Sequence, residues 1–225
     1  TDLYKTLQEL RVTGGEPLMS QHTWRLIEWF KLNKGRSNTR LAINSNLVAQ
    51  CDIDRLLEST KGLEFDLYTS NEAIGVQAEY IRDGLNWRAW MDNMHRLASS
   101  KQLRGLHVMA TINALCLDSL PEFLDLLLRE FKMKYGKSTP TFTLNILRFP
   151  SFQSPLVLPD SIRTYYREQL QEWFDNNAYN EFIHQYERNQ LRRLIDYLDV
   201  VKTPHVGAAE QSVLQKDFKQ FFTQY

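Results

Sequence analysis

Polar residues that could bind a ligand recur at five points of the chain, each directly after a segment that is predicted to be a β-strand. The groups are Thr13-Gly14-Gly15-Glu16, Asn44-Ser45-Asn46, Thr69-Ser70-Asn71-Glu72, Thr111-Ile112-Asn113 and Asn145-Ile146-Leu147-Arg148. In α/β barrels, the carboxyl ends of the strands line the active site. The groups would then ring one mouth with hydrogen-bonding atoms and few charges, which suits a polar small molecule or cofactor. The alternative is that strand ends are polar because loops are polar.

The first group contains Gly14-Gly15 followed by Glu16 and Pro17. Two glycines at a strand end let a ligand approach the backbone closely, although such a pair is also a common turn. Pro17 suits the first turn of a helix. A carboxylate at Glu16 could bind a ligand or interact favourably with the amino end of that helix, and both roles are compatible.

Alternating strands and helices must position these groups. The predicted strands are residues 7–12, 40–46, 63–69, 105–113 and 141–149. The predicted helices are residues 18–33, 52–59, 73–98 with interruptions at Gly75 and Gly84, 121–135, 161–174 and 182–200. Five strand-then-helix units predict an α/β fold with a parallel sheet that right-handed crossovers curl into a barrel or partial barrel. We expect a core over residues 1–175 and a C-terminal helical extension over residues 176–225.

Composition narrows the class of protein. The 225 residues carry 27 Lys and Arg against 27 Asp and Glu, and this balance argues against a general electrostatic grip on nucleic acid or anionic lipid. No apolar run approaches the roughly 18 residues that a membrane span needs, so we expect a cytoplasmic protein. The two cysteines, Cys51 and Cys116, show no metal-ligand spacing. The five histidines form no ligand pair either, so no metal ligand is assigned.

Several segments, in order, resemble the radical S-adenosylmethionine (radical SAM) superfamily. The segment RVTGGEPL at residues 11–18 resembles its Gly-Gly-Glu-Pro motif. FDLYTSNE at residues 65–72 and AEYIRDGL at residues 78–85 resemble its fourth-strand serine and acid motif and the segment that follows. NILRFPSFQSPLVLP at residues 145–159 resembles the sixth strand of twitch-domain radical SAM proteins, many of which phages encode. The resemblance covers roughly residues 5–200.

The resemblance implies an enzyme that uses S-adenosylmethionine (AdoMet) and a 4Fe–4S cluster. In that family, reductive cleavage of AdoMet gives a 5′-deoxyadenosyl radical, which abstracts a substrate hydrogen. The family's cluster loop, C-x-x-x-C-x-x-C, follows its first strand and precedes Gly-Gly-Glu-Pro, but no cysteine precedes residue 51 here. By this comparison the chain corresponds to strands two to six, and the first strand and the cluster loop are missing. We therefore expect residues 7–12 to form an exposed edge of the sheet, and the chain alone to be inactive.

The resemblance also implies which residues bind the cofactor. They are Gly14, Gly15, Glu16, Pro17, Asn44, Asn46, Ser70, Glu72, Arg82, Asn113, Leu147 and Arg148. Residues 14–16 would meet the methionine amino group through backbone carbonyls. Ser70 and Glu72 would contact the ribose hydroxyls or the methionine end, and Arg82 would clamp the methionine carboxylate. Backbone at residues 147–149 would flank the adenine. The competing local roles are helix capping, turn formation and surface ion pairing.

The resemblance leaves the substrate open between a peptide and a small molecule, and no catalytic residue is assigned. It implies an electron donor such as flavodoxin or ferredoxin. The alternative function is a degenerate barrel that binds a nucleotide or peptide without radical chemistry.

Overall fold

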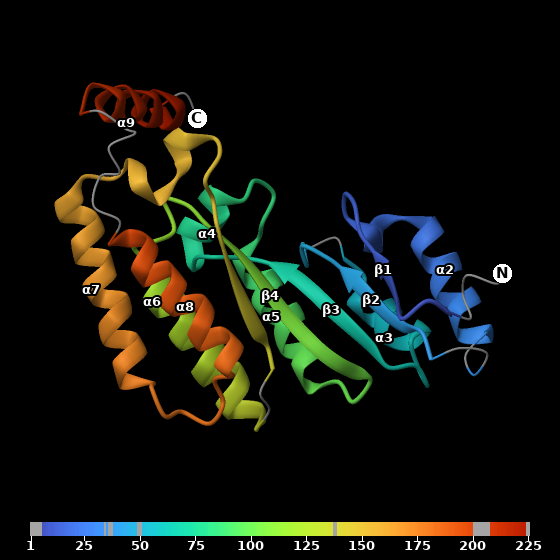
Figure 1. Ribbon diagram of the computed structural model, residues 1–225. Coiled ribbons are helices and arrows are strands. Elements are labelled where there is room, and N and C mark those ends of the chain that lie inside the picture. The colour runs from blue at the N-terminus through green and yellow to red at the C-terminus, as the bar shows by residue number, and fades with distance from the viewer. Residues whose placement is uncertain are drawn as a thin grey trace.

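The computed structural model describes residues 6–33, 35, 38–48, 51–136, 139–199 and 208–223 (Figure 1). Its strands are β1 (Glu9–Val12), β2 (Arg40–Asn44), β3 (Phe65–Ser70), β4 (Leu103–Ile112) and β5 (Thr141–Ile146). Its α-helices are α2 (Gln21–Leu32), α3 (Ile53–Ser59), α4 (Gly75–Ile81), α5 (Trp87–Ser99), α6 (Leu120–Leu126), α7 (Asp160–Asn176), α8 (Gln185–Leu198) and α9 (Ala208–Thr223). Short 3-10 turns are η1 (Pro17–Met19), η3 (Ser151–Gln153) and η4 (Pro155–Val157), and η2 (Leu127–Met133) is a π-helix that continues α6.

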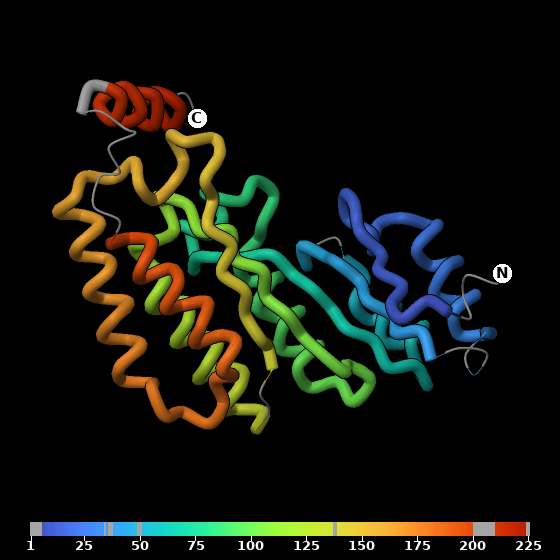
Figure 2. Tube along the Cα trace, in the orientation of Figure 1, coloured from blue at the N-terminus to red at the C-terminus, as the bar shows by residue number. Residues whose placement is uncertain are grey.

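The strands form one parallel sheet in the order β1-β2-β3-β4-β5, and Figure 2 shows the chain stepping across it in sequence order. This confirms the predicted α/β class. Among the described strands, β1 pairs with β2 alone, which confirms that residues 7–12 contribute an edge of the sheet. Because all strands are parallel, their carboxyl ends lie along the same edge.

Only one face of the sheet is strongly apolar. The side chains of Ile43, Leu67, Val108 and Leu144 are fully buried on that face, and helices α2, α3, α5, α6, α7 and α8 also contribute residues to the core. The residues that alternate with them are half-buried and mostly polar: Asn44, Tyr68, His107, Met109, Thr111, Thr141 and Thr143. A parallel sheet usually has helices on both faces. Here the polar face is the concave inside of a partial barrel.

The helix predictions are confirmed with shifted ends. The segment predicted at residues 18–33 divides into η1 and α2, because the Ser20 hydroxyl accepts a hydrogen bond from the His22 amide and starts a new helix. Gly75 opens α4 with φ +53 instead of interrupting a helix, whereas Gly84 lies between α4 and α5, as predicted. Helix α9 lies within the C-terminal extension that was predicted to be helical, although no separate helix was predicted over its residues. Within the described part of the chain, no helix combines the length and apolarity that crossing a membrane requires.

Helix α8 covers the outer edge of β5. The amide of Phe142 donates to Oε1 of Glu187 over 2.8 Å, and the guanidinium of Arg193 donates to the Leu144 carbonyl. Nζ of Lys132 donates to both carboxylate oxygens of Glu187, to Oε1 at 2.7 Å and to Oε2 at 2.6 Å. Both side chains are almost completely buried. Burial lowers the pKa of Lys132, and the Glu187 carboxylate opposes that change. The edge that could accept another strand is thus occupied by side chains of α8.

Candidate functional site

The turn after β1 presents open backbone. Gly14 and Gly15 are exposed, with φ of +95 and +52, conformations that side chains other than glycine rarely adopt. Glu16 then turns its carboxylate inward: Oε1 accepts the Leu18 amide at 3.1 Å and Oε2 accepts the Asn46 amide at 2.7 Å. The predicted Glu16 therefore caps η1 and also ties the turn after β1 to the turn after β2.

The turn after β2 contains an acceptor without a partner. Oδ1 of Asn44 is buried and has no hydrogen-bond donor among the described residues. Leu47 adopts φ +53 and is fully buried, and its carbonyl accepts from Asn93 Nδ2 at 3.3 Å. Because an unsatisfied buried oxygen is costly, a donor from a ligand at this strand end would stabilise it.

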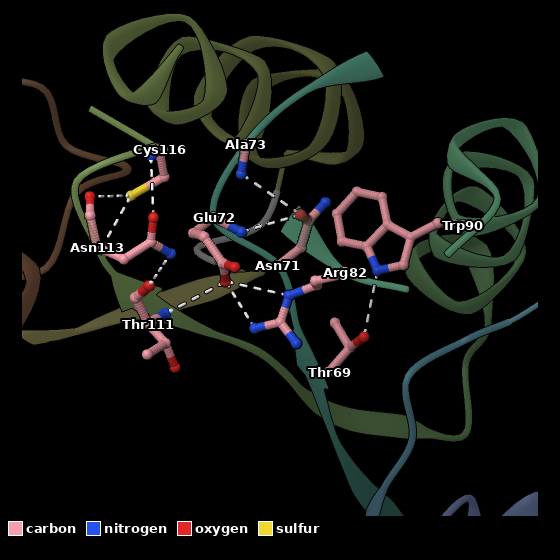
Figure 3. Close-up of polar contacts among 9 residues, drawn as sticks. All are labelled: Thr69, Asn71, Glu72, Ala73, Arg82, Trp90, Thr111, Asn113 and Cys116. Carbon is pink, nitrogen blue, oxygen red and sulfur yellow. Dashed lines mark hydrogen bonds and ion pairs between the residues drawn. The ribbon is translucent and has the colours of Figure 1, made fainter. Parts of the chain in front are cut away.

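The end of β3 is held by a buried carboxylate (Figure 3). Oε2 of Glu72 accepts from Nε of Arg82 at 3.1 Å, from Nη2 of Arg82 at 2.6 Å and from the Thr111 amide at 3.3 Å. Burial raises the pKa of Glu72, and Arg82 opposes this rise. The pair joins the ends of β3 and α4 to β4. Nη1 of Arg82 has no partner within the described structure, and 25% of the side chain is exposed, so the guanidinium keeps a donor for a ligand.

Three of the predicted residues line one small cavity. Asn46, Ser70 and Arg82 surround a volume of about 270 Å³, together with apolar side chains from the same loops and Asp83. They come from the ends of β2, β3 and α4, and the fold brings them together at the carboxyl edge of the sheet. Glu16 adjoins this cavity through its bond to the amide of Asn46.

Asn113 lies apart from that cavity and is used locally. Its Oδ1 accepts the amides of Leu115 and Cys116 at 2.9 and 3.2 Å, and its Nδ2 donates to the Thr111 carbonyl at 3.1 Å (Figure 3). It also lines a larger cavity that shares Ile81 and Asp83 with the small one.

The predicted residues after β5 lie along the continuation of the sheet. The amide of Leu147 donates to the carbonyl of Ile112 at 2.8 Å, so it extends the pairing of β4 with β5. Arg148 is exposed, and its guanidinium lies 5.7 Å from the ring centre of Tyr197. Neither residue belongs to the cavity around Asn46.

A ladder of side chains crosses the concave face, and the sequence analysis did not predict it. The guanidinium of Arg11 lies 4.0 Å from the ring centre of Tyr68, which stacks on His107 at 4.3 Å. Nδ1 of His107 is 2.6 Å from the hydroxyl of Thr141. Burial lowers the pKa of His107, and the nearby Asp66 partly opposes this. The signal in the sequence that could have indicated this face was the alternation of polar and apolar residues along β4.

Gly105 makes room for this ladder. A Cβ atom there would lie 2.6 Å from Nε2 of His107 and 2.8 Å from Oδ1 of Asp66. Asp66 in turn is held by the guanidinium of Arg104. A larger residue at this position would therefore force the His107 ring or the Asp66 carboxylate to move.

The cysteines do not form a cluster site. Cys51 and Cys116 are both buried, and burial raises the pKa of each thiol, that of Cys51 to about 11. Iron–sulfur ligation needs thiolates. Among the described residues, no three His, Cys, Asp or Glu side chains gather in a way that could hold a metal. The residues present do not fit a 4Fe–4S cluster.

No protein-family model matches the sequence, and no curated protein is detectably similar. Among solved structures, native anSMEcpe with bound AdoMet and a Cp18Cys peptide is similar with a TM-score of 0.54 and 10% identity, over 78% of this chain and 49% of that chain. Native anSMEcpe with bound AdoMet, and its complex with a Kp18Cys peptide, each give a TM-score of 0.53 and 11% identity, over 78% and 48%.

This chain spans about half the length of those structures. At such low identity the likeness establishes the fold. The five-stranded parallel sheet and its helices resemble the partial barrel of those structures, which confirms the expected α/β partial barrel.

Proposed function

We propose that this chain is the AdoMet-binding core of a radical SAM enzyme. The observation that carries the proposal is the gathering of the motif residues Asn46, Ser70 and Arg82, with Glu16 beside them, at the carboxyl edge of the sheet. All but Asn46 lie in the segments that carry the sequence resemblance, and Asn46 lies in the polar group that follows β2. The likeness of the fold to AdoMet-bound structures supports the same ligand.

The atoms present fit the polar groups of AdoMet. The exposed backbone at Gly14 and Gly15 offers carbonyl acceptors for an ammonium group, and Nη1 of Arg82 offers a donor for a carboxylate. The unpaired Oδ1 of Asn44 would accept from a hydroxyl or amino group. Backbone at Leu147 would flank the adenine. Glu72 would have two roles. It would orient Arg82 through their two hydrogen bonds, and it would also contact the ribose.

The proposed chemistry of the complete enzyme is reductive cleavage of AdoMet to a 5′-deoxyadenosyl radical that abstracts a substrate hydrogen. The described residues would supply the cofactor site, while the cluster ligands and the contact for an electron donor would come from elsewhere. Two of the similar structures hold a peptide, so a peptide is the first substrate class to examine. The twitch-domain and phage-type assignments belong to this proposal as well.

The test is AdoMet binding by this chain, measured by isothermal titration calorimetry. A Ser70→Tyr substitution would fill the small cavity and should lower the affinity at least tenfold, which is about 1.4 kcal/mol. Ser161→Tyr, at an exposed position in α7, is the matched control and should bind like the parent. Circular dichroism would confirm that both variants fold. Equal affinities in all three proteins would contradict the proposed site, and binding of ATP in preference to AdoMet would favour the degenerate barrel.

A further inference from the structure

The larger cavity at the carboxyl edge has no role in the proposed cofactor site. It encloses about 620 Å³ between α4, the turn after β4, η3 and the C-terminal helix α9. This volume lies within the usual range for small-molecule sites. In Figure 1, α9 lies across the end of the barrel next to the segment that contains η3.

Aromatic rings form most of the apolar wall. Phe218, Phe221 and Phe222 face the cavity from α9, and Tyr80 faces it from α4. The rings are held in place: Phe221 packs against Phe152 at 5.3 Å, and the hydroxyl of Tyr80 donates to the Phe222 carbonyl at 3.4 Å. Such faces bind apolar groups, and they also attract cations through their electron-rich surfaces.

The charged groups of the wall have one sign. Glu79 and Asp83 line the cavity, and no Lys or Arg does so among the described residues. Glu79 is oriented by the Trp87 amide, which donates to its Oε1 at 2.8 Å. The neighbouring Arg82 turns to Glu72 instead, and Asp83 has no ion partner within the described chain. A cation in this cavity would therefore meet two carboxylates and several aromatic faces.

We propose that this cavity binds an organic ammonium ion carried on an aromatic or alkyl body. The apolar body would occupy the space between the phenylalanine rings of α9 and Tyr80, and the ammonium group would lie toward Glu79 and Asp83. The cavity shares Ile81 and Asp83 with the cofactor cavity. It is thus placed to hold the substrate of the reaction, an assignment that rests on the proposed function, whereas the ammonium binding itself does not.

Three probes of matched shape and different charge test the inference: 2-phenylethylammonium, 2-phenylethanol and 3-phenylpropionate. Their binding to the full chain would be measured by ligand-observed NMR and calorimetry. The ammonium probe should bind at least fivefold more tightly than the alcohol, and the carboxylate should bind more weakly than both. Comparable binding of all three probes, or no binding of the ammonium probe, would overturn the proposal.

Substitutions test whether the ammonium probe binds in this cavity. Asp83→Asn should weaken binding of the ammonium probe about threefold to tenfold and leave the alcohol unaffected, since it removes charge with little change of shape. Asp196→Asn, at an exposed position in α8, is the control and should change neither. If Asp83→Asn and Asp196→Asn behave alike, the assignment fails. AdoMet affinity, measured on the same proteins, tests the proposed function separately.

Discussion

Glu16 and Glu72 are two acidic residues of the predicted site whose carboxylates bind the protein's own donors. Each joins segments that are far apart in the sequence, Glu16 across the turns after β1 and β2, and Glu72 across β3, α4 and β4. Their motif roles and their capping roles are compatible, because a carboxylate has two oxygens with several acceptor positions. At the scale of single residues, these two carboxylates accept hydrogen bonds that order the site in the absence of a ligand.

Removal of Arg82 tests this ordering. Arg82→Met would leave Glu72 buried without its cation, so we expect the free energy of unfolding to fall by about 3–5 kcal/mol at neutral pH. Burial already raises the pKa of Glu72, and the loss of Arg82 would raise it further. A raised pKa means that the Glu72 contribution to stability is fully present below its unfolded pKa and is lost as pH rises through its folded pKa.

The variant should therefore lose stability relative to the parent between pH 4.5 and pH 7, as measured by urea denaturation at several pH values. Arg167→Met removes a more exposed ion pair with Asp199 and should cost less than about 1 kcal/mol. A pH-independent difference between Arg82→Met and the parent would show that Glu72 is not the group responsible.

At the scale of elements, the two edges of the sheet differ. β5 is covered by α8, whose Glu187 and Arg193 occupy its outward backbone groups, whereas β1 has no strand beyond it among the described residues. The π-helix η2 contributes Lys132 to this closure, and the Phe182 carbonyl also accepts from Lys132 at 3.0 Å. Three elements thus meet at one buried ion pair.

Lys132→Met should be among the most destabilising single substitutions in this region. It would leave a completely buried carboxylate without its ammonium partner, at an expected cost of about 3–5 kcal/mol in urea denaturation. Lys132→Met combined with Glu187→Gln should recover part of the loss, because the amide oxygen can still accept the Phe142 amide. Lys134→Met removes an exposed pair with Glu130 and is the control. A loss from Lys132→Met that is no larger than the control would contradict this interpretation.

At the scale of the whole molecule, the described residues form a small cavity at the carboxyl edge of the sheet, a concave polar face and a larger cavity under α9, but no group of cluster ligands. The chain also covers about half of each similar structure. If the proposed function is right, AdoMet cleavage is expected only where cluster ligands are supplied in addition to the described residues.

Anaerobic reconstitution with iron and sulfide checks this expectation. With dithionite and AdoMet, a protein that joins this chain to a C-x-x-x-C-x-x-C cluster loop should form 5′-deoxyadenosine, detected by liquid chromatography, and this chain treated identically should form none. Failure of that cluster-loaded protein to cleave AdoMet would refute the enzymatic proposal. Cleavage by this chain alone would show that cluster ligands come from within it.

The order of the elements could be predicted from the sequence because it depends on local patterns. Apolar alternation and turn residues placed five strands between helices, and parallel strands bring their polar ends to one edge. Gly14-Gly15 predicted open backbone for a related local reason, since positive φ favours glycine. Helix α9 was predicted only as part of the C-terminal helical extension and its bounds were not, although the spacing of Phe218, Phe221 and Phe222 is helical.

Other features depend on contacts between distant segments. The sequence could not show that Asn46, Ser70 and Arg82 share a cavity while Asn113 lies outside it, because loop paths decide which side chains meet. The ladder from Arg11 to Thr141 needs four strands in register, and the cavity under α9 needs a helix more than a hundred residues away from Tyr80. Local pattern determined the fold and the edge that carries the site, and only tertiary packing decided which groups face a ligand and which hold the protein together.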